Sequence, residues 1–296
     1  MNVASLKSRL KRNAINNDRS FNELLQMYFL ERFLYRLSIS EYKNNFTIKG
    51  GILLYAIFNE NYARATSDID LLGSRISNNE ETIKESIIQI CKQECDDLVT
   101  FKTDEMNVKK ITEFKEYNGI NVEIPARIDK IRGRVSIDIG FGDVVYPRKE
   151  IIQFPTLASD TPLEIYAYSK ETIIAEKFQA IVSLALVNSR LKDFYDIYAL
   201  SNEFDFKGEI LKEALVETFE HRNTDFDEIL AFEDDFITSY RKGQWTSFLK
   251  KKSPNTKVDL GDVIYRIRKF IMPVVDSIKK ESDFNLEWDC KSDVWK

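Results

Sequence analysis

Two carboxylates flank one apolar residue at Asp68-Ile69-Asp70, directly before Leu71 and Leu72. In a β-strand, residues two apart share a face, so both carboxylates point the same way while Ile69 points into a core. Ionised carboxylates side by side repel each other, and a hard cation such as Mg²⁺ between them relieves the repulsion. The pair predicts a metal site. The alternative is an edge strand with two solvated acids.

A double glycine precedes this pair in the chain. Phe46 to Lys49 forms a short apolar strand that enters Gly50 and Gly51, and the apolar run 52–58 then predicts one buried helix. Glycine lets a backbone approach a ligand closely, and a helix N-terminus attracts anions. Glycine turn, helix and Asp-x-Asp strand in this order predict a nucleoside triphosphate held by its phosphates at one end and by metal at the other.

A third acid, Asp138, lies in a segment that alternates apolar and polar residues. Residues 122–124 and 135–139 predict a hairpin around a loop ending in Gly133. A buried acid needs a partner. If this strand neighbours the Asp68–Asp70 strand, Asp138 completes a three-carboxylate metal cluster; the alternative is a lone acid on the solvent face of a hairpin.

Further charged residues occur in the second half of the chain. Ser169 is an N-cap candidate for a helix over 170–187 that is apolar nearly all round, with Lys177 embedded in it. Such a lysine either neutralises a bound anion or forms a structural salt bridge. On the next helix, Arg190, Asp193 and Asp196 recur every three residues, either as an internal ionic staple or as a half-buried network.

The remaining pattern predicts an α/β protein of two domains. Residues 1–160 are expected to form a mixed-sheet domain with N-terminal helices, and residues 161–296 a mainly helical domain. Pro147, Pro155 and Pro162 make the stretch around them the best linker candidate. Helices are expected, besides those above, over the following ranges: 3–16, one capped by Ser20 with Glu23, 78–95, 209–219, 225–240, 245–251 and 259–278.

Composition excludes several kinds of chemistry. The 296 residues carry a net charge of −5 and a single histidine, His221, so histidine-based nucleophilic or metal chemistry is not expected. The three cysteines make no disulfide or zinc framework and are expected to be reduced. With no signal peptide and no long apolar run, we expect a cytoplasmic protein without a membrane partner.

Together these residues resemble the nucleotidyltransferase superfamily and, within it, the AbiEii/AbiGii toxin family of bacterial toxin–antitoxin and abortive-infection systems. The matching blocks stand in the family's order: Lys49-Gly50-Gly51, Arg64-x-Thr66-Ser67-Asp68-x-Asp70, Ile137-Asp138-Ile139, Ala175-Glu176-Lys177 and Arg190-x-Lys192-Asp193-x-x-Asp196. They span residues 46–198, about half of the chain. The resemblance implies transfer of a nucleotide from an NTP to an acceptor, such as the 3′ end of tRNA, which would block translation in phage defence.

The resemblance also implies roles for individual residues. Asp68, Asp70 and Asp138 would hold Mg²⁺, with Mn²⁺ as an alternative. Backbone N–H groups at Gly50 and Gly51 would cradle the triphosphate. The other residues implied in nucleotide binding are Lys49, Arg64, Ser67, Lys177, Arg190 and Asp196. Asp193 is the expected functional acid of the last motif, with Asp196 second.

Two other functions remain open from the sequence. The same fold could modify a protein hydroxyl by nucleotidyl or phosphoryl transfer, and an acidic or neutral rim around the site would favour that acceptor. A basic rim would favour tRNA. The chain could also be a non-catalytic module that binds a nucleotide or a partner. A cognate antitoxin protein is an expected partner of a toxin of this family.

Overall fold

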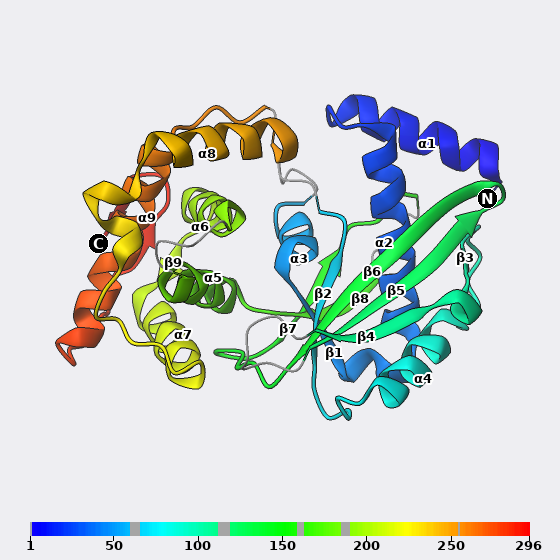
Figure 1. The fold of residues 1–296 in the computed structure, drawn as a ribbon, viewed down its shortest axis with the longest axis horizontal. Helices are drawn as coiled ribbons and strands as arrows, with labels where there is room; N and C mark the ends of the chain where they lie inside the picture. Colours follow the sequence, from blue (N-terminus) through cyan, green and yellow to red (C-terminus); the bar gives the residue numbers. More distant parts are fainter. Residues whose placement is uncertain (1, 60–65, 112–118, 159–162, 185–189, 254) are drawn as a thin grey trace. The chain divides into compact units, whose positions relative to one another are not determined.

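The computed structural model describes residues 2–59, 66–111, 119–158, 163–184, 190–253 and 255–296 (Figure 1). The chain divides into two compact units, which are described separately. The first contains Met1–Gly142 and Lys149–Tyr168, and the second contains Asp143–Arg148 and Ser169–Lys296. No helix in the described ranges is long and apolar enough to cross a membrane.

The first unit combines a mixed sheet with helices. Its helices are α1 (Val3–Asn16), α2 (Phe21–Ile39), η1 (Glu41–Asn44), α3 (Gly50–Ile57), α4 (Glu80–Cys91) and η2 (Thr103–Glu105). Its strands are β1 (Phe46–Lys49), β2 (Ile69–Gly73), β3 (Thr100–Phe101), β4 (Asn107–Ile111), β5 (Gly119–Ile128), β6 (Ile131–Phe141), β7 (Glu150–Phe154) and β8 (Leu163–Ala167).

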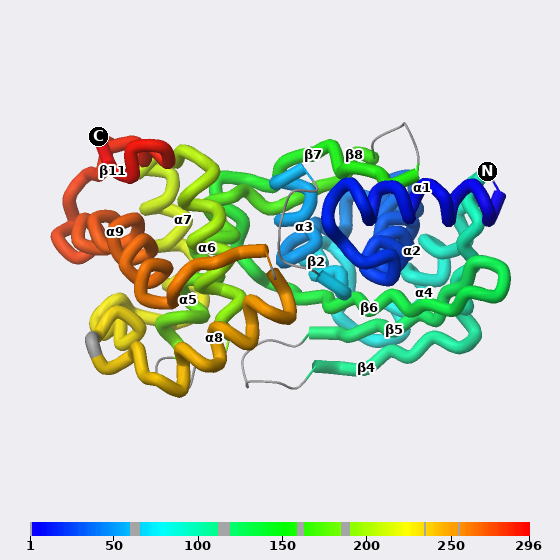
Figure 2. The backbone as a smooth tube through the Cα atoms, turned by 90° about the horizontal axis from the view of Figure 1, so that it is seen from above, coloured from blue at the N-terminus to red at the C-terminus, as the bar shows by residue number. Residues whose placement is uncertain are grey.

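The strands lie in the order β3-β5-β6-β2-β1-β8-β7, and β4 also pairs with β5. The pairs β2–β6 and β1–β8 are parallel, and the other pairs are antiparallel. Figure 2 shows β4, β5 and β6 side by side. The predicted mixed sheet with N-terminal helices is therefore confirmed.

Helix α2 covers one face of this sheet. Its Ser20 N-cap accepts a hydrogen bond from the backbone N–H of Glu23, as the capping box predicts. Phe29 and Phe33 of α2 are fully buried. Phe29 lies so close to Gly133 of β6 that a Cβ there would stand 2.3 to 2.8 Å from its ring. Residues 133, 135, 137 and 139 of β6 thus face α2, and the even-numbered residues between them face away.

Two sequence expectations for this unit are wrong. The hairpin turn lies at Asp129 and Lys130, and Gly133 belongs to β6 rather than to the loop. The proline-punctuated stretch is not a plain linker. Its part Lys149–Tyr168 belongs to the first unit, where β7 and β8 pair as an antiparallel hairpin at the sheet edge, and Asp143–Arg148, with Pro147, belongs to the second unit. Pro155 directly follows β7, a place where the missing N–H interrupts no ladder. Pro162 lies outside the described residues.

The second unit is mainly helical, as predicted. Its elements are α5 (Lys170–Leu184), α6 (Leu191–Glu203), β9 (Phe206–Lys207), α7 (Gly208–His221), η4 (Leu230–Phe232), η5 (Asp234–Phe236), α8 (Ser239–Lys252), α9 (Leu260–Lys279), β10 (Glu287–Asp289) and β11 (Val294–Trp295). Helices α5, α6, α7 and α9 pack on one another. The side chain of Ser169 accepts a hydrogen bond from the backbone N–H of Thr172, so Ser169 caps the start of α5 as predicted.

The predicted helix over 225–240 is wrong. The segment holds only the short turns η4 and η5 before α8 begins at Ser239. Phe232 and Phe236 are buried at helical spacing, but Asp225 accepts a hydrogen bond from the Asp227 N–H and closes a local turn instead. Acidic side chains that bond to nearby backbone compete with helix formation in this way.

A small antiparallel sheet in the order β11-β10-β9 was not predicted either. Its strands have two or three residues, too few for a period-2 pattern. Trp288 of β10 is fully buried against Phe270 of α9, and Trp295 of β11 stacks on Phe270 with ring centroids 5.7 Å apart. Aromatic packing, rather than strand length, holds this sheet in place.

Candidate active site

The pairing of β1, β2 and β6 sets the side chains of the site in a row. Lys49 lies opposite Asp70 in the antiparallel β1–β2 ladder, and Asp70 lies opposite Asp138 in the parallel β2–β6 ladder. Asn121 of β5 continues the row as the partner of Asp138. Residues directly opposite each other project from the same face of a sheet. The prediction that the Asp138 strand neighbours the Asp68–Asp70 strand is confirmed.

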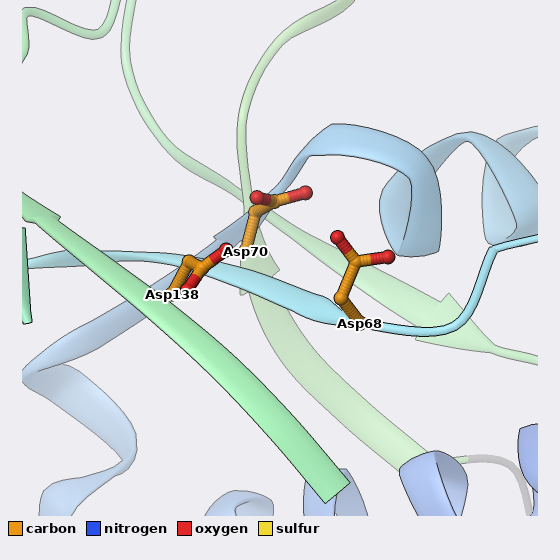
Figure 3. Close-up of side chains that lie close together, drawn as sticks. All are labelled: Asp68, Asp70 and Asp138. Carbon is orange, nitrogen blue, oxygen red and sulfur yellow. The ribbon is translucent and has the colours of Figure 1, made fainter. Parts of the chain in front are cut away.

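Three carboxylates converge at this row. Asp68 lies just before β2, and one oxygen each of Asp68, Asp70 and Asp138 lies within 4.8 Å of the others. All three side chains are half-buried. Figure 3 shows them gathered where β2 and β6 run side by side. Three acids this close repel one another when ionised, and a divalent cation among them would offset that repulsion.

Hydrogen bonds orient two of these carboxylates. Asp68 Oδ1 accepts from the backbone N–H of Ser67 at 3.2 Å and from Thr66 Oγ1 at 3.3 Å. Asp138 Oδ1 accepts from Asn121 Nδ2 at 2.7 Å. Within the described residues, these donors bond to Oδ1 of each carboxylate and not to Oδ2. The Oδ2 atoms of Asp68 and Asp138 can therefore accept another ligand.

Gly50 lies against the third carboxylate. It begins α3 with φ +65°, in the left-handed region that favours glycine. A Cβ at this position would overlap Asp70 Oδ2 and stand 2.6 Å from its Cγ. The N-terminus of α3 therefore lies directly against the carboxylate of Asp70. Lys49, the residue before it, lies over the ring of Tyr168 at 5.3 Å.

A hollow of about 660 Å³ opens beside Asp68 and Asp138. Residues of α2, of the Ser67 segment and of β6 line it: Gln26, Ser67, Asp68, Arg132, Gly133, Arg134, Ser136 and Asp138. Gln26 Nε2 donates to the carbonyl oxygens of Ser67 and Arg134, at 3.2 and 2.9 Å, and so ties one wall to the other. The hollow thus has both acidic and arginine side chains in its walls, all from the first unit.

The second unit holds a buried charge cluster. Lys177 of α5 is 8% exposed, and its Nζ lies 3.2 Å from Asp193 Oδ1 and 2.6 Å from Asp196 Oδ2. Arg190 Nε lies 2.7 Å from Asp193 Oδ2, and both acids are fully buried. These distances thus join two cations and two carboxylates in one cluster. These contacts form a buried ionic network rather than a half-buried one. They join α5 to α6, so they are more than a staple within one helix, and Lys177 makes the salt bridge that was one of its two sequence interpretations.

The structure groups the sequence-predicted site residues into two sets. Lys49, Gly50, Gly51, Ser67 and the three acids lie together in the first unit; Lys177, Arg190, Asp193 and Asp196 lie together in the second. Arg64 lies outside the described residues.

Sequence reasoning missed Asn121, Gln26 and the arginines of β6. Asn121 is only 9% exposed, and its Oδ1 has no hydrogen-bond partner. In the sequence, Asn121 and Glu123 alternate with valine and isoleucine, and this pattern predicts that the two polar residues share one face of a strand. It does not predict that Asn121 lies opposite Asp138, because the strand register depends on the fold.

A mixed sheet that presents three carboxylates beside a glycine turn and a helix N-terminus is the arrangement of a nucleotidyltransferase. Residues 32–265 match the family model described as nucleotidyl transferase AbiEii toxin of a type IV toxin–antitoxin system. The match covers most of the chain, and the chain belongs to this family. Nucleotidyl transfer, with an NTP and a divalent metal, is the activity that this membership supports.

Two solved structures from Helicobacter pylori share the fold. One is a candidate nucleotidyltransferase, with a TM-score of 0.51 and 13% sequence identity over 90% of this chain and 100% of that one. The other is JHP933, with a TM-score of 0.52 and 13% identity over 88% of this chain and 95% of that one. Among curated proteins, no sequence matches this chain significantly.

Proposed function

We propose that this protein is a Mg²⁺-dependent toxin that transfers a nucleotide from an NTP to the 3′ end of tRNA and so blocks translation in the cytoplasm. The convergence of Asp68, Asp70 and Asp138 on neighbouring parallel strands is the observation that carries the proposal. A cognate antitoxin that restrains this activity is the partner that family membership implies, and phage defence is the proposed setting.

The donor set fits a hard divalent cation. Mg²⁺ binds oxygen ligands at about 2.0–2.1 Å, so two ligands of one ion lie up to about 4.2 Å apart. The three carboxylate oxygens lie within 4.8 Å of one another, so small side-chain rotations suffice to bring them to that spacing. Mn²⁺ accepts the same ligands. Two such ions stabilise the attacking and leaving oxygens of an in-line displacement when bound. Asp68, Asp70 and Asp138 would hold them.

The reaction joins the acceptor oxygen to the α-phosphorus and breaks the bond from that phosphorus to the bridging oxygen of the β-phosphate. Pyrophosphate leaves with the electron pair of that bond. The proton of the acceptor hydroxyl passes to the carboxylate of Asp138. Asn121 donates a hydrogen bond to Oδ1 of this carboxylate and so orients it. No histidine is required, which suits a chain whose only histidine, His221, lies at the end of α7 in the second unit.

The triphosphate is proposed to bind at the start of α3. Backbone N–H groups of Gly50 and Gly51 belong to the unsatisfied first turn of this helix, and the helix dipole favours an anion there. Lys49 adds a positive charge at the same end. Ser67, whose backbone N–H already donates to Asp68, is proposed to contact the nucleotide as well. The same role is proposed for Arg64, as the resemblance implies.

The charge cluster of the second unit is proposed to assist with the same substrate. Lys177 would contact the β- or γ-phosphate, with Arg190 as a second cation. Asp193 is the proposed functional acid, and Asp196 holds the ammonium of Lys177 at 2.6 Å. A purely structural ion pair would give the same contacts, and the variants described in the Discussion separate the two roles.

Incubation with total tRNA, Mg²⁺ and each radiolabelled NTP in turn tests the proposal. We expect label on tRNA with one NTP. Prior periodate oxidation of the 3′-terminal ribose of the tRNA should prevent this labelling, and Asp70→Ala should abolish it. Label on protein in a lysate, and none on RNA, would instead identify a protein acceptor. No label on either, with no thermal stabilisation by NTP at millimolar concentration, would identify a non-catalytic module.

A further inference from the structure

The outer face of the β5–β6 hairpin carries three arginines in a row that leads away from the carboxylates. Arg132, Arg134 and Ser136 alternate with core residues along β6 and therefore share the face of Asp138. Arg127 of β5 lies directly opposite Arg132. Arg127, Arg132 and Arg134 are named here the arginine strip. All three are exposed.

The arrangement is unfavourable for the hairpin alone. Like charges directly opposite each other on neighbouring strands destabilise a sheet. Arg127 and Arg132 form such a pair, and neither makes an ion pair with any residue of the described ranges. Arg134 has one acidic partner, Glu123, at 3.3 Å, and this pair is largely solvated. An exposed surface with uncompensated cations at fixed spacing fits a polyanionic ligand.

The strip is continuous with the reactive centre. Arg132, Arg134 and Asp138 all line the hollow that opens beside Asp68. From Asp138 to Arg132 the strand advances six residues, or roughly 20 Å. In a helical nucleic-acid strand, phosphates recur every ~3.4 Å of axis, so this length accommodates several of them. Lys109 of β4, opposite Asn121, adds a cation on the same face.

We propose that the arginine strip binds the backbone phosphates of the acceptor strand and thereby presents its 3′ hydroxyl at Asp138. This inference rests on the proposed function, since it assigns the acceptor side of the same site. The alternative anion, the triphosphate of the donor, is less well matched. Its proposed place at Gly50 lies on the far side of Asp70, two strands away from β6 and hence about 10 Å across the sheet.

The test measures RNA binding without catalysis. The probe is a fluorescently labelled single-stranded RNA of roughly 12 nucleotides with a free 3′ hydroxyl, titrated with full-length protein in Mg²⁺ without NTP. For the double variant Arg127→Gln/Arg132→Gln we expect roughly tenfold weaker binding. We also expect a slope of log K against log salt that is shallower by about 1.4, or ~0.7 for each lost phosphate contact.

Two controls make the result specific. Lys84→Gln/Lys110→Gln removes the same number of exposed charges, from α4 and from the other face of β4, and is expected to bind the probe as the wild type does. Arg134→Gln alone should give half the change in slope, so the inference stays testable if the double variant folds poorly. The KM for NTP is expected to be unchanged in every variant.

Several outcomes would overturn the inference. These are a wild type that does not bind the probe, strip variants that bind it normally, and a raised KM for NTP with normal RNA binding. Loss of protein labelling with normal RNA binding would assign the strip to a protein acceptor and would equally overturn it. RNA binding through the strip by an enzyme that labels only protein would overturn the proposed tRNA acceptor. It would also overturn the presentation of a 3′ hydroxyl at Asp138, and the strip would keep an RNA-binding role only.

Discussion

The start of α3 and the carboxylate of Asp70 are in direct contact, because Gly50 leaves no side chain between them. The same residue has φ +65°, which other residues adopt only with strain. Gly50 thus meets two requirements at once, a left-handed backbone and room for the Asp70 carboxylate. The contact joins the proposed triphosphate site and the proposed metal site at one position.

Gly50→Ala should therefore abolish nucleotidyl transfer. The added Cβ overlaps Asp70 and must displace its carboxylate, while the left-handed backbone costs roughly 1–2 kcal/mol of stability. Transfer rate and Mg²⁺ affinity by calorimetry are the measurements. The control is Gly243→Ala in α8, where a Cβ meets nothing within 4 Å and should raise stability by about 0.5–1 kcal/mol. Normal Mg²⁺ affinity in Gly50→Ala would contradict the assigned contact.

Asp68→Ala and Asp70→Ala should each lower the transfer rate by roughly 10²–10³-fold or more, since each removes a proposed metal ligand. Neither should lower the melting temperature measured in EDTA, because each relieves repulsion within the cluster. Adding Mg²⁺ should raise the melting temperature of the wild type but not that of the variants. Unfolding of either variant in EDTA would make the pair structural.

Asn121 is expected to act by positioning Asp138. Asn121→Ala removes the donor to Asp138 Oδ1 and should weaken Mg²⁺ binding and transfer by about 10–100-fold. Asn121→Asp adds a fourth carboxylate beside Asp68, Asp70 and Asp138, so the variant should be less stable than the wild type in EDTA, and Mg²⁺ should restore its stability. Asn107→Ala on β4 is the matched control, because Asn107 is exposed and lies opposite Glu123. Equal losses in Asn121→Ala and Asn107→Ala would remove this role.

Lys177→Met should lower the free energy of unfolding by about 3–5 kcal/mol, because it removes the ammonium that lies 2.6 Å from the fully buried carboxylate of Asp196. Adding Asp196→Asn restores charge balance, since Arg190 still pairs with Asp193, and should regain most of that stability. Denaturant unfolding measures both effects. If Lys177 contacts phosphate, the double variant keeps a KM for NTP at least tenfold above the wild type. A normal KM in the stable double variant would leave Lys177 a structural role only.

Local patterns in the sequence determined a large part of this protein. The capping box at Ser20 and the apolar stripes of α1, α2 and α9 depend on residues within a few positions of one another, and the structure follows them. The period-2 spacing of Asp68 and Asp70 already predicted a shared face. The order of the motifs was sufficient to indicate the nucleotidyltransferase class.

Contacts between distant segments decided the rest. Asp138 became the third acid only because β6 pairs in parallel with β2 at one register, and a shift of one residue would have turned it to the other face. The same pairing placed Asn121 on Asp138 and set Arg127 opposite Arg132. The segment 225–240 had helical spacing yet formed turns, because side-chain hydrogen bonds and tertiary burial outweighed its weak helix propensity. Strand register and burial depend on the whole fold, so no single segment of the sequence specified them.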